Sequence, residues 1–557
     1  MAENKDEENQ RWSRAEIAKK LAEFEARESD SQRQMAKELE IPRSTLQYWL
    51  ARKSSLEADP AVIAFLESPV GIAFLHRLVV AAQFVITLLG GGGIRLVSVF
   101  LELSGLAVFV AASYGAQQKV TLAIEQAVIE FGQAERERLG QGMAAKQITV
   151  CEDETFHPET CLVAIEPVSN YILLEQYAAD RQAKTWTQAL AQATAGLRVE
   201  IIQSTSDEGK GLLRHVEVEL GAHHSPDVFH VQHEVVKGVG GALASKERKA
   251  ERAATEAREK VNELQKRLET GERVAQVLTQ RLTQARQQEQ ASQQALEMAS
   301  RQRERARQAI QGLSLSYHPY DLETGAERNA EQVSVSLAQH FAQIEGVASE
   351  VELSENAFKK IAKAKKVVAA MVTTIAFFWL TLRAKVEALA LTPQVEQAVY
   401  QHLIPGIYLH LVAEKMADPQ QKLRLQQTSQ ELLAPLQAND GLLRGLTAEE
   451  VTILEQVAWE CVHLFQRSSS CVEGRNGQLA LHHHRLHRIS SRKLAALTTV
   501  HNYFVKREDG TTSAERFFGA KPRNLFEWVL DRVDLPGRPA DKRTQPQRAG
   551  YLVTAAT

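Results

Sequence analysis

Three acidic residues stand where their side chains could act together on a phosphodiester. Asp153 lies in the β-rich run QITVCEDETF, Asp207 follows the run IIQS, and Glu473 lies far downstream in SSSCVEGRNGQL. Cleaving or joining a DNA strand needs an activated water or 3′-hydroxyl and a stabilised leaving oxygen, and two Mg²⁺ ions supply both. Mg²⁺ prefers oxygen ligands such as carboxylates. The three acids are therefore candidate catalytic residues and metal ligands, with Mn²⁺ as a substitute ion.

The first two acids also have structural interpretations. Glu152 and Glu154 flank Asp153, so this stretch could be a charged loop. Asp207 could cap a helix that starts at EGKGLL. Its neighbour Glu208 is a rival ligand for the second position of the metal site.

Glu473 follows Ser470 by three residues, and S-x-x-E is the pattern of a capping box at a helix start. That role is compatible with catalysis, because a helix start can face a cleft. A second motif, D-x-x-H, is formed by Asp227 and His230, with His233 shortly after. These could be auxiliary site residues, and Asp227 is also a rival for the second acid. A histidine with satisfied hydrogen bonds on a strand or at a helix start is the structural alternative. A zinc site would need further ligands, and none is near at a suitable spacing.

The elements that must position these residues can be read from the pattern. Short β-rich runs cover 147–156, 161–169 and 171–178, followed by a helical run and a fourth strand that ends before Asp207. Three strands, a helix and a fourth strand match the first half of a ribonuclease H-like α/β core. Its first and fourth strands are neighbours, so Asp153 and Asp207 should point to one place.

The N-terminal part predicts a helix-turn-helix unit. Ser31 and Gln34 form a capping-box pair, Pro42 marks the turn, and Ser44 is expected to cap the second helix. Short polar and basic side chains at the start of a second helix suit the major groove. A small helical hairpin inside a larger core is the alternative. The expected DNA-reading residues are Arg43, Ser44, Thr45, Gln47 and Tyr48, with Arg52 and Lys53 on the same helix.

Most of the remaining chain reads as helical. The stripe of Val, Leu and Ala over 245–310 predicts a coiled coil or a long helical hairpin. The expected fold is a ribonuclease H-like core interrupted by a large all-α insertion, helix-rich overall. Its parts are a helix-turn-helix domain (1–55), an apolar helical region that could hold a second such unit (56–140), the first part of the core (141–240), the insertion (241–460), the last part of the core (461–535) and a disordered tail (536–557).

The composition suits a soluble protein. The chain has 557 residues, a net charge of −3 and four cysteines, too few for a disulfide scaffold. The polar N-terminus does not resemble a signal peptide. The apolar runs 78–94 and 367–382 are expected to be buried helices rather than membrane spans.

These residues together resemble a family. The chain is similar to bacterial insertion-sequence DDE transposases on a ribonuclease H-like core. The resemblance places the triad on Asp153 in CEDET, Asp207 in STSDEGKG and Glu473, while Asp227 and His230 resemble the [C/D]-x-x-H signature of Mutator-like transposases. The separation 473 − 207 = 266 implies an all-helical insertion.

The resemblance implies Mg²⁺-dependent cleavage at element ends and strand transfer into target DNA. The partners would be double-stranded terminal repeats and target, bound by a homodimer or higher oligomer in the bacterial cytoplasm, associated with the nucleoid and with no membrane. Arg475, Asn476 and the histidine- and arginine-rich stretch 482–488 could contact DNA backbone. Two alternatives stay open: a DNA-binding regulator derived from an inactive transposase, and a coiled-coil assembly protein.

Overall fold

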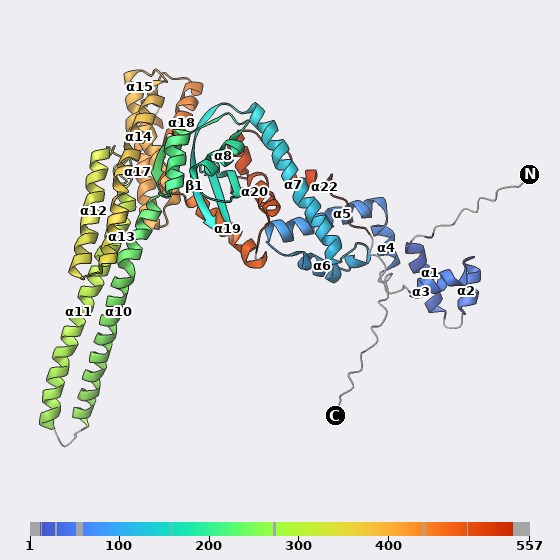
Figure 1. Cartoon of the computed structure of the whole chain (residues 1–557), viewed down its shortest axis with the longest axis horizontal. Helices are drawn as coiled ribbons and strands as arrows, with labels where there is room; N and C mark the ends of the chain where they lie inside the picture. The colour runs from blue at the N-terminus through green and yellow to red at the C-terminus, as the bar shows by residue number, and fades with distance from the viewer. Residues whose placement is uncertain are drawn as a thin grey trace, which may run out of the picture. The chain divides into compact units, whose positions relative to one another are not determined.

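The computed structural model describes residues 12, 14–27, 31–51, 59–156, 159–270, 275–437, 441–486 and 488–537 (Figure 1). The chain divides into two compact units, residues 1–143 with 475–557, and residues 144–474. The boundary falls inside helix α19 (Ser470–Leu486). The expected last part of the core, 461–535, is therefore divided between both units. The expected disordered tail lies outside the described residues from 538 onward.

The first three helices are α1 (Arg14–Ala26), α2 (Gln32–Glu38) and α3 (Arg43–Ala51). They share a small core that includes Met35, Leu46 and Trp49. The predicted capping box at Ser31 is confirmed. The predicted cap at Ser44 is wrong, because α3 already begins at Arg43. The carbonyl of Pro42 accepts the first helical hydrogen bonds, from the N–H groups of residues 45 and 46.

The rest of the first unit is also helical. Before the sheet come α4 (Pro60–Leu66), α5 (Pro69–Phe84), η2 (Val85–Leu89), α6 (Ile94–Leu103), η3 (Leu106–Val108) and α7 (Tyr114–Gly142). After α19 come α20 (Ser491–Tyr503), α21 (Ser513–Phe518) and α22 (Leu525–Leu530). Glu135 on α7 is fully buried and binds Arg138 and Arg523. This ion pair joins the two sequence-distant parts of the unit.

Two described helical stretches, 69–89 and 355–387, are long and apolar enough to cross a membrane by length and composition alone. In each, 39% of the most apolar window is buried. Helix α14 (Val368–Glu387) buries Met371, Ile375, Phe378 and Leu382 along one face, while Leu380 on another face is 72% exposed. The expected burial therefore holds for one face of this helix.

The second unit contains a five-stranded mixed sheet with the order β3-β2-β1-β4-β5. The strands are β1 (Lys146–Phe156), β2 (Thr160–Glu166), β3 (Tyr171–Tyr177), β4 (Val199–Ser206) and β5 (His223–Pro226). The pairs β1–β2 and β2–β3 are antiparallel, whereas β1–β4 and β4–β5 are parallel. The predicted strands and the following helix, α8 (Ala183–Thr194), are confirmed.

The connections set how the sheet is covered. Trp186 and Leu190 of α8 pack on Leu162 and Leu174 of the antiparallel strands. Between β4 and β5 the chain forms α9 (Lys210–Arg214) and η4 (His215–Leu220). Because β1, β4 and β5 run parallel, their carboxyl ends meet at one edge of the sheet.

A large helical region leaves the sheet after β5. It comprises α10 (Val228–Glu269), α11 (Ala275–Ser316), α12 (Ala330–Glu350), α13 (Glu355–Lys365), α14, α15 (Pro393–Ala398), η5 (Val399–Leu403), α16 (Ile404–Lys415), α17 (Pro419–Gln437) and α18 (Ala448–His463). Figure 1 shows α10 and α11 side by side as a long hairpin, whose seam contains Val261, Leu264, Leu278 and Leu282. The stripe over 245–310 is therefore a hairpin seam within one chain.

Candidate functional site

Asp153 on β1 and Asp207 directly after β4 follow the last paired residues of two adjacent parallel strands. The register pairs Cys151 of β1 with Thr205 of β4, and each acid comes two residues later. Side chains alternate between the two faces of a strand, so the carboxylate of Asp153 lies on the face that carries Cys151. The charge of Asp207 acts on the carboxyl of Asp153, so the two acids lie near each other.

The acids that flank Asp153 face the opposite side of the sheet. Glu152 is fully buried and accepts a hydrogen bond from the hydroxyl of Ser204 at 2.5 Å. Glu154 accepts one from the indole N–H of Trp186 on α8 at 3.2 Å. The interpretation of this stretch as a charged loop is therefore wrong, because the residues form a regular strand that separates Asp153 from both glutamates.

The surroundings of Asp153 disfavour its charged form. Burial first, and then the charges of Asp207 and Asp227, raise the pKa of its carboxyl to about 6, although the backbone N–H of Glu154 and the nearby His230 lower it. Two carboxylates that share one place cannot both ionise without cost. A bound cation would offset this repulsion.

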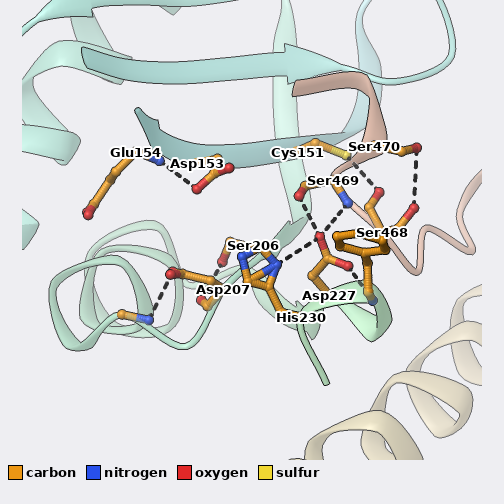
Figure 2. Close-up of polar contacts among 12 residues, drawn as sticks. Cys151, Asp153, Glu154, Ser206, Asp207, Asp227, His230, Ser468, Ser469 and Ser470 are labelled. Carbon is orange, nitrogen blue, oxygen red and sulfur yellow. Dashed lines mark hydrogen bonds and ion pairs between the residues drawn. The ribbon is translucent and has the colours of Figure 1, made fainter. Parts of the chain in front are cut away.

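Asp227 has a different role from the other two aspartates. Its Oδ1 accepts from the N–H of Phe229 at 2.8 Å and so caps α10. Its Oδ2 accepts from the N–H of Ser469 at 2.9 Å and from the hydroxyl of Ser469 at 2.5 Å. The side chain is 2% exposed, and Nδ1 of His230 lies 3.6 Å from Oδ2 (Figure 2). Both carboxylate oxygens of Asp227 therefore already accept hydrogen bonds, and these bonds fix the start of α10 to Ser469.

We call residues 466–470 the return segment, because here the chain comes back from the helical region to the sheet. The carbonyl of Gln466 accepts a hydrogen bond from the hydroxyl of Ser225 on β5 at 2.8 Å. The thiol of Cys151 on β1 donates to the carbonyl of Ser468 at 3.6 Å, as Figure 2 shows. The segment therefore crosses the face of the sheet that carries Asp153 and Asp207.

The return segment leads directly into α19, the helix of Glu473. Ser470 is the first helical residue, and the carbonyl of Ser469 accepts from the N–H of Val472 at 2.8 Å and of Glu473 at 3.4 Å. The expected cap at Ser470 is therefore wrong by one position. Glu473 lies in the first turn, as predicted, and is exposed.

Within the described residues, no three or more His, Cys, Asp or Glu side chains are grouped so that they could hold a metal ion. The charges of Asp207, Asp227 and His230 act on the carboxyl of Asp153. In the described part of the chain, neither these residues nor Glu473 form a ligand cluster.

The expected DNA-contacting residues divide into two sets. On α3, Arg43, Ser44, Gln47 and Tyr48 are exposed and Thr45 is partly buried. Tyr48 is 54% exposed, so this face is open to a partner. On α19, in contrast, the side chain of Arg475 is 5% exposed and donates to Gln478, and Asn476 is partly buried. Arg52, Lys53 and His487 lie outside the described residues.

Sequence reasoning missed the polar residues that anchor the return segment. Ser469 and Ser225 bind through their hydroxyls, and Gln203 and Thr205 of β4 contact the carbonyl of Gln466 at 3.4 Å each. The available signal was the run of four polar residues, QSTS, at the end of a strand. Small hydroxyl residues in a buried strand need partners, but the sequence does not say which segment provides them.

Comparison with known proteins gives one partial match. Residues 399–545 match a model described as a family of unknown function, DUF6399. The matched part contains the return segment and Glu473 but neither Asp153 nor Asp207. No curated protein and no solved structure matches the chain.

Proposed function

We propose that the chain is a metal-dependent polynucleotidyl transferase of the DDE transposase class, built on a ribonuclease H-like core. The observation that carries the proposal is the Asp153–Asp207 pair, side by side on β1 and at the end of β4. The strand order β3-β2-β1-β4-β5 with β2 antiparallel to both neighbours supports this core. Acids at the carboxyl ends of its central parallel strands are the arrangement that such chemistry needs.

The donor set fits a divalent cation. Asp153 and Asp207 offer carboxylate oxygens, which Mg²⁺ and Mn²⁺ prefer. The raised pKa of Asp153, caused first by burial and then by Asp207, is typical of buried carboxylates that lie close together. When bound, the cation would supply activation of a water or 3′-hydroxyl and stabilisation of the leaving oxygen.

The chain's own residues position this pair. Asp153 is fixed by the backbone of β1, and Oδ1 of Asp207 accepts from the N–H of Gly209 at 3.1 Å, which orients its carboxylate. Asp227 accepts two hydrogen bonds from Ser469 of the return segment. These bonds fix the position at which α19, the helix of Glu473, begins. In the proposed reaction Glu473 joins the pair once DNA is bound.

The exposed face of α3 supports sequence-specific binding of duplex DNA. Gln47 and Tyr48 are exposed, whereas Leu46 and Trp49 on the same helix form the small core. This division places the polar side chains on the exposed side of α3, where major-groove reading would need them.

The test is a cleavage and strand-transfer assay with Mg²⁺ and duplexes that carry the sequences flanking the coding region. Asp153→Asn and Asp207→Asn should each lower the rate at least ~100-fold, in the range that loss of a group acting on the reacting phosphate produces. The matched control is Glu200→Gln, an exposed acid on β4 itself. Wild-type rates in both aspartate variants would refute the proposal.

One observation favours a second candidate, a DNA-binding regulator without catalysis. Glu473 is exposed and stands outside any ligand cluster among the described residues. A regulator would bind the flanking duplexes in a gel shift and leave them intact under every divalent cation tested.

A further inference from the structure

Helix α13 carries an unusual density of lysines. Between 359 and 366 the sequence reads KKIAKAKK, with five lysines in eight residues. Lys363 and Lys366 lie four and seven residues after Lys359. At ~100° per residue they fall within ~60° of one another and form one stripe ~10 Å long. All three side chains are exposed.

Two lysines face the neighbouring helices. Lys365 pairs with both carboxylate oxygens of Glu345 on α12, at 2.8 and 3.0 Å. Lys360 donates to the backbone carbonyl of Lys237 on α10 at 3.1 Å. These contacts fix the rotation of α13.

Two of the stripe lysines form ion pairs at the surface. Nζ of Lys359 lies 2.9 Å from Glu355 on the same helix, and Nζ of Lys363 lies 3.3 Å from Glu234 on α10. Exposed ion pairs of this kind contribute little to stability, so a phosphate can compete for both lysines.

Helix α13 is held close to the start of α10. A Cβ at Gly238 of α10 would stand 3.2 Å from the carbonyl oxygen of Ala357 and 3.3 Å from Cβ of Lys360, so glycine permits the close approach. Nζ of Lys363 lies 3.3 Å from Glu234. Glu234 stands one turn after His230 on α10, ~6 Å along the helix.

The contacts at the start of α10 place Lys363 near the candidate site. Asp227 caps α10, and Nδ1 of His230 in its first turn lies 3.6 Å from Oδ2 of Asp227. Glu234, the partner of Lys363, follows His230 by one turn. The lysine stripe therefore lies near the end of α10 that Asp227 caps.

We propose that Lys359, Lys363 and Lys366 form a track for the phosphate backbone of duplex DNA, which holds the strand that flanks the Asp153–Asp207 pair. The inference rests on the proposed function and adds a DNA surface in the helical region, separate from α3. The acid pair repels phosphates, and a nearby row of ammonium groups offsets that repulsion. A length of ~10 Å corresponds to the rise of about three base pairs.

The experiment measures binding of the full chain to a random-sequence duplex by fluorescence anisotropy over a range of salt concentrations. The slope of log K against log salt is negative, and each lost phosphate contact lowers its magnitude by about 0.9. The triple variant Lys359→Ala/Lys363→Ala/Lys366→Ala should therefore lower the magnitude of this slope by about 2 to 3. The control triple, Arg383→Ala/Lys422→Ala/Arg424→Ala, removes the same charge from α14 and α17 and should leave the slope unchanged.

The outcomes separate this inference from the proposed function. If the wild-type chain binds duplex DNA and the stripe variant keeps the full slope, the track is refuted while the transposase proposal stands. If the wild-type chain binds no duplex DNA, both fail. Binding of the stripe to anionic phosphatidylserine vesicles but not to DNA would overturn the choice of partner. Circular dichroism and the melting temperature of both triples report whether the variants fold.

Discussion

The carboxylate of Asp227 accepts a hydrogen bond from the hydroxyl of Ser469 at 2.5 Å, although 242 residues separate them in the sequence. The same oxygen accepts from the backbone N–H of Ser469. Asp227 starts the helical region and Ser469 directly precedes the helix of Glu473. This contact therefore sets the distance between the strand ends and α19.

We expect the contributions of Asp227 and Ser469 to the free energy of unfolding to be strongly coupled. Asp227→Ala would leave buried donors unpaired and should lower the free energy of unfolding by about 3 kcal/mol, and Ser469→Ala by about 1 kcal/mol. A double-mutant cycle in chemical denaturation should give a coupling energy of about 1–2 kcal/mol. The control is Asp321→Ala, since Asp321 also accepts three hydrogen bonds but in an exposed turn. Additive effects would show that the contact does not join the two segments.

Cation binding should depend on the aspartate pair even without DNA. A ligand at 100 times its Kd stabilises the folded state by about 2.7 kcal/mol. Mn²⁺ or Mg²⁺ should therefore raise the melting temperature of the wild type, and Asp153→Asn or Asp207→Asn should abolish the shift. Glu200→Gln should keep it. A shift that persists in both aspartate variants would place the cation elsewhere.

Glu473 should matter for catalysis and little for cation binding by the free protein. It is exposed in the first turn of α19 and is not part of a ligand cluster among the described residues. Glu473→Gln should keep the cation-dependent melting shift within experimental error and lower the cleavage rate at least ~100-fold. A variant that cleaves like the wild type removes Glu473 from the site.

The pKa of Asp153 predicts the sign of a pH effect on stability. In the unfolded chain a carboxyl titrates near its ordinary value of ~3.9, whereas burial raises the pKa of Asp153 to about 6 in the folded chain. The folded state therefore binds the proton more tightly, so stability is greatest below pH ~4 and falls as the pH rises to about 6. The upper limit of this loss is about 3 kcal/mol, since one pKa unit corresponds to 1.36 kcal/mol.

Denaturation in EDTA at pH 4.5 and 7.5 measures this effect. Asp153→Asn should remove it and be more stable than the wild type at pH 7.5. Asp180 serves as a control in which the effect of pH on stability has the opposite sign, because hydrogen bonds from Thr185 and Gln182 lower the pKa of its carboxyl. A wild type that gains as much stability as Asp153→Asn between the two pH values would contradict the assignment.

Local patterns were enough to predict most elements of the fold. The strands around Asp153 and Asp207 and the capping box at Ser31 depend on residues a few positions apart, and all were confirmed. The start of α3 was misplaced because the backbone carbonyl of Pro42 accepts the first helical hydrogen bonds, and a backbone group leaves no trace in residue type.

The candidate site was predictable only in part. That Asp153 and Asp207 should meet follows from parallel strand pairing, which the order of elements suggested. The hydrogen bonds between Asp227 and Ser469 and between Ser225 and Gln466 join segments hundreds of residues apart, and no local pattern encodes such pairing. Arg475 was expected to contact DNA because it is basic, but its burial depends on packing.

The ends of the helical region are hydrogen-bonded neighbours, since the N–H of Val228 donates to the carbonyl of Arg467 at 3.0 Å. Closing a flexible loop of this length costs about 5 kcal/mol of chain entropy, against about 2 kcal/mol for ten residues. This difference is removed if the helices between these ends assemble first and deliver both ends together. We therefore expect the helical region to gain hydrogen-exchange protection before the return segment docks on the sheet during refolding. Simultaneous protection of both in a pulse-labelling experiment would exclude this folding order.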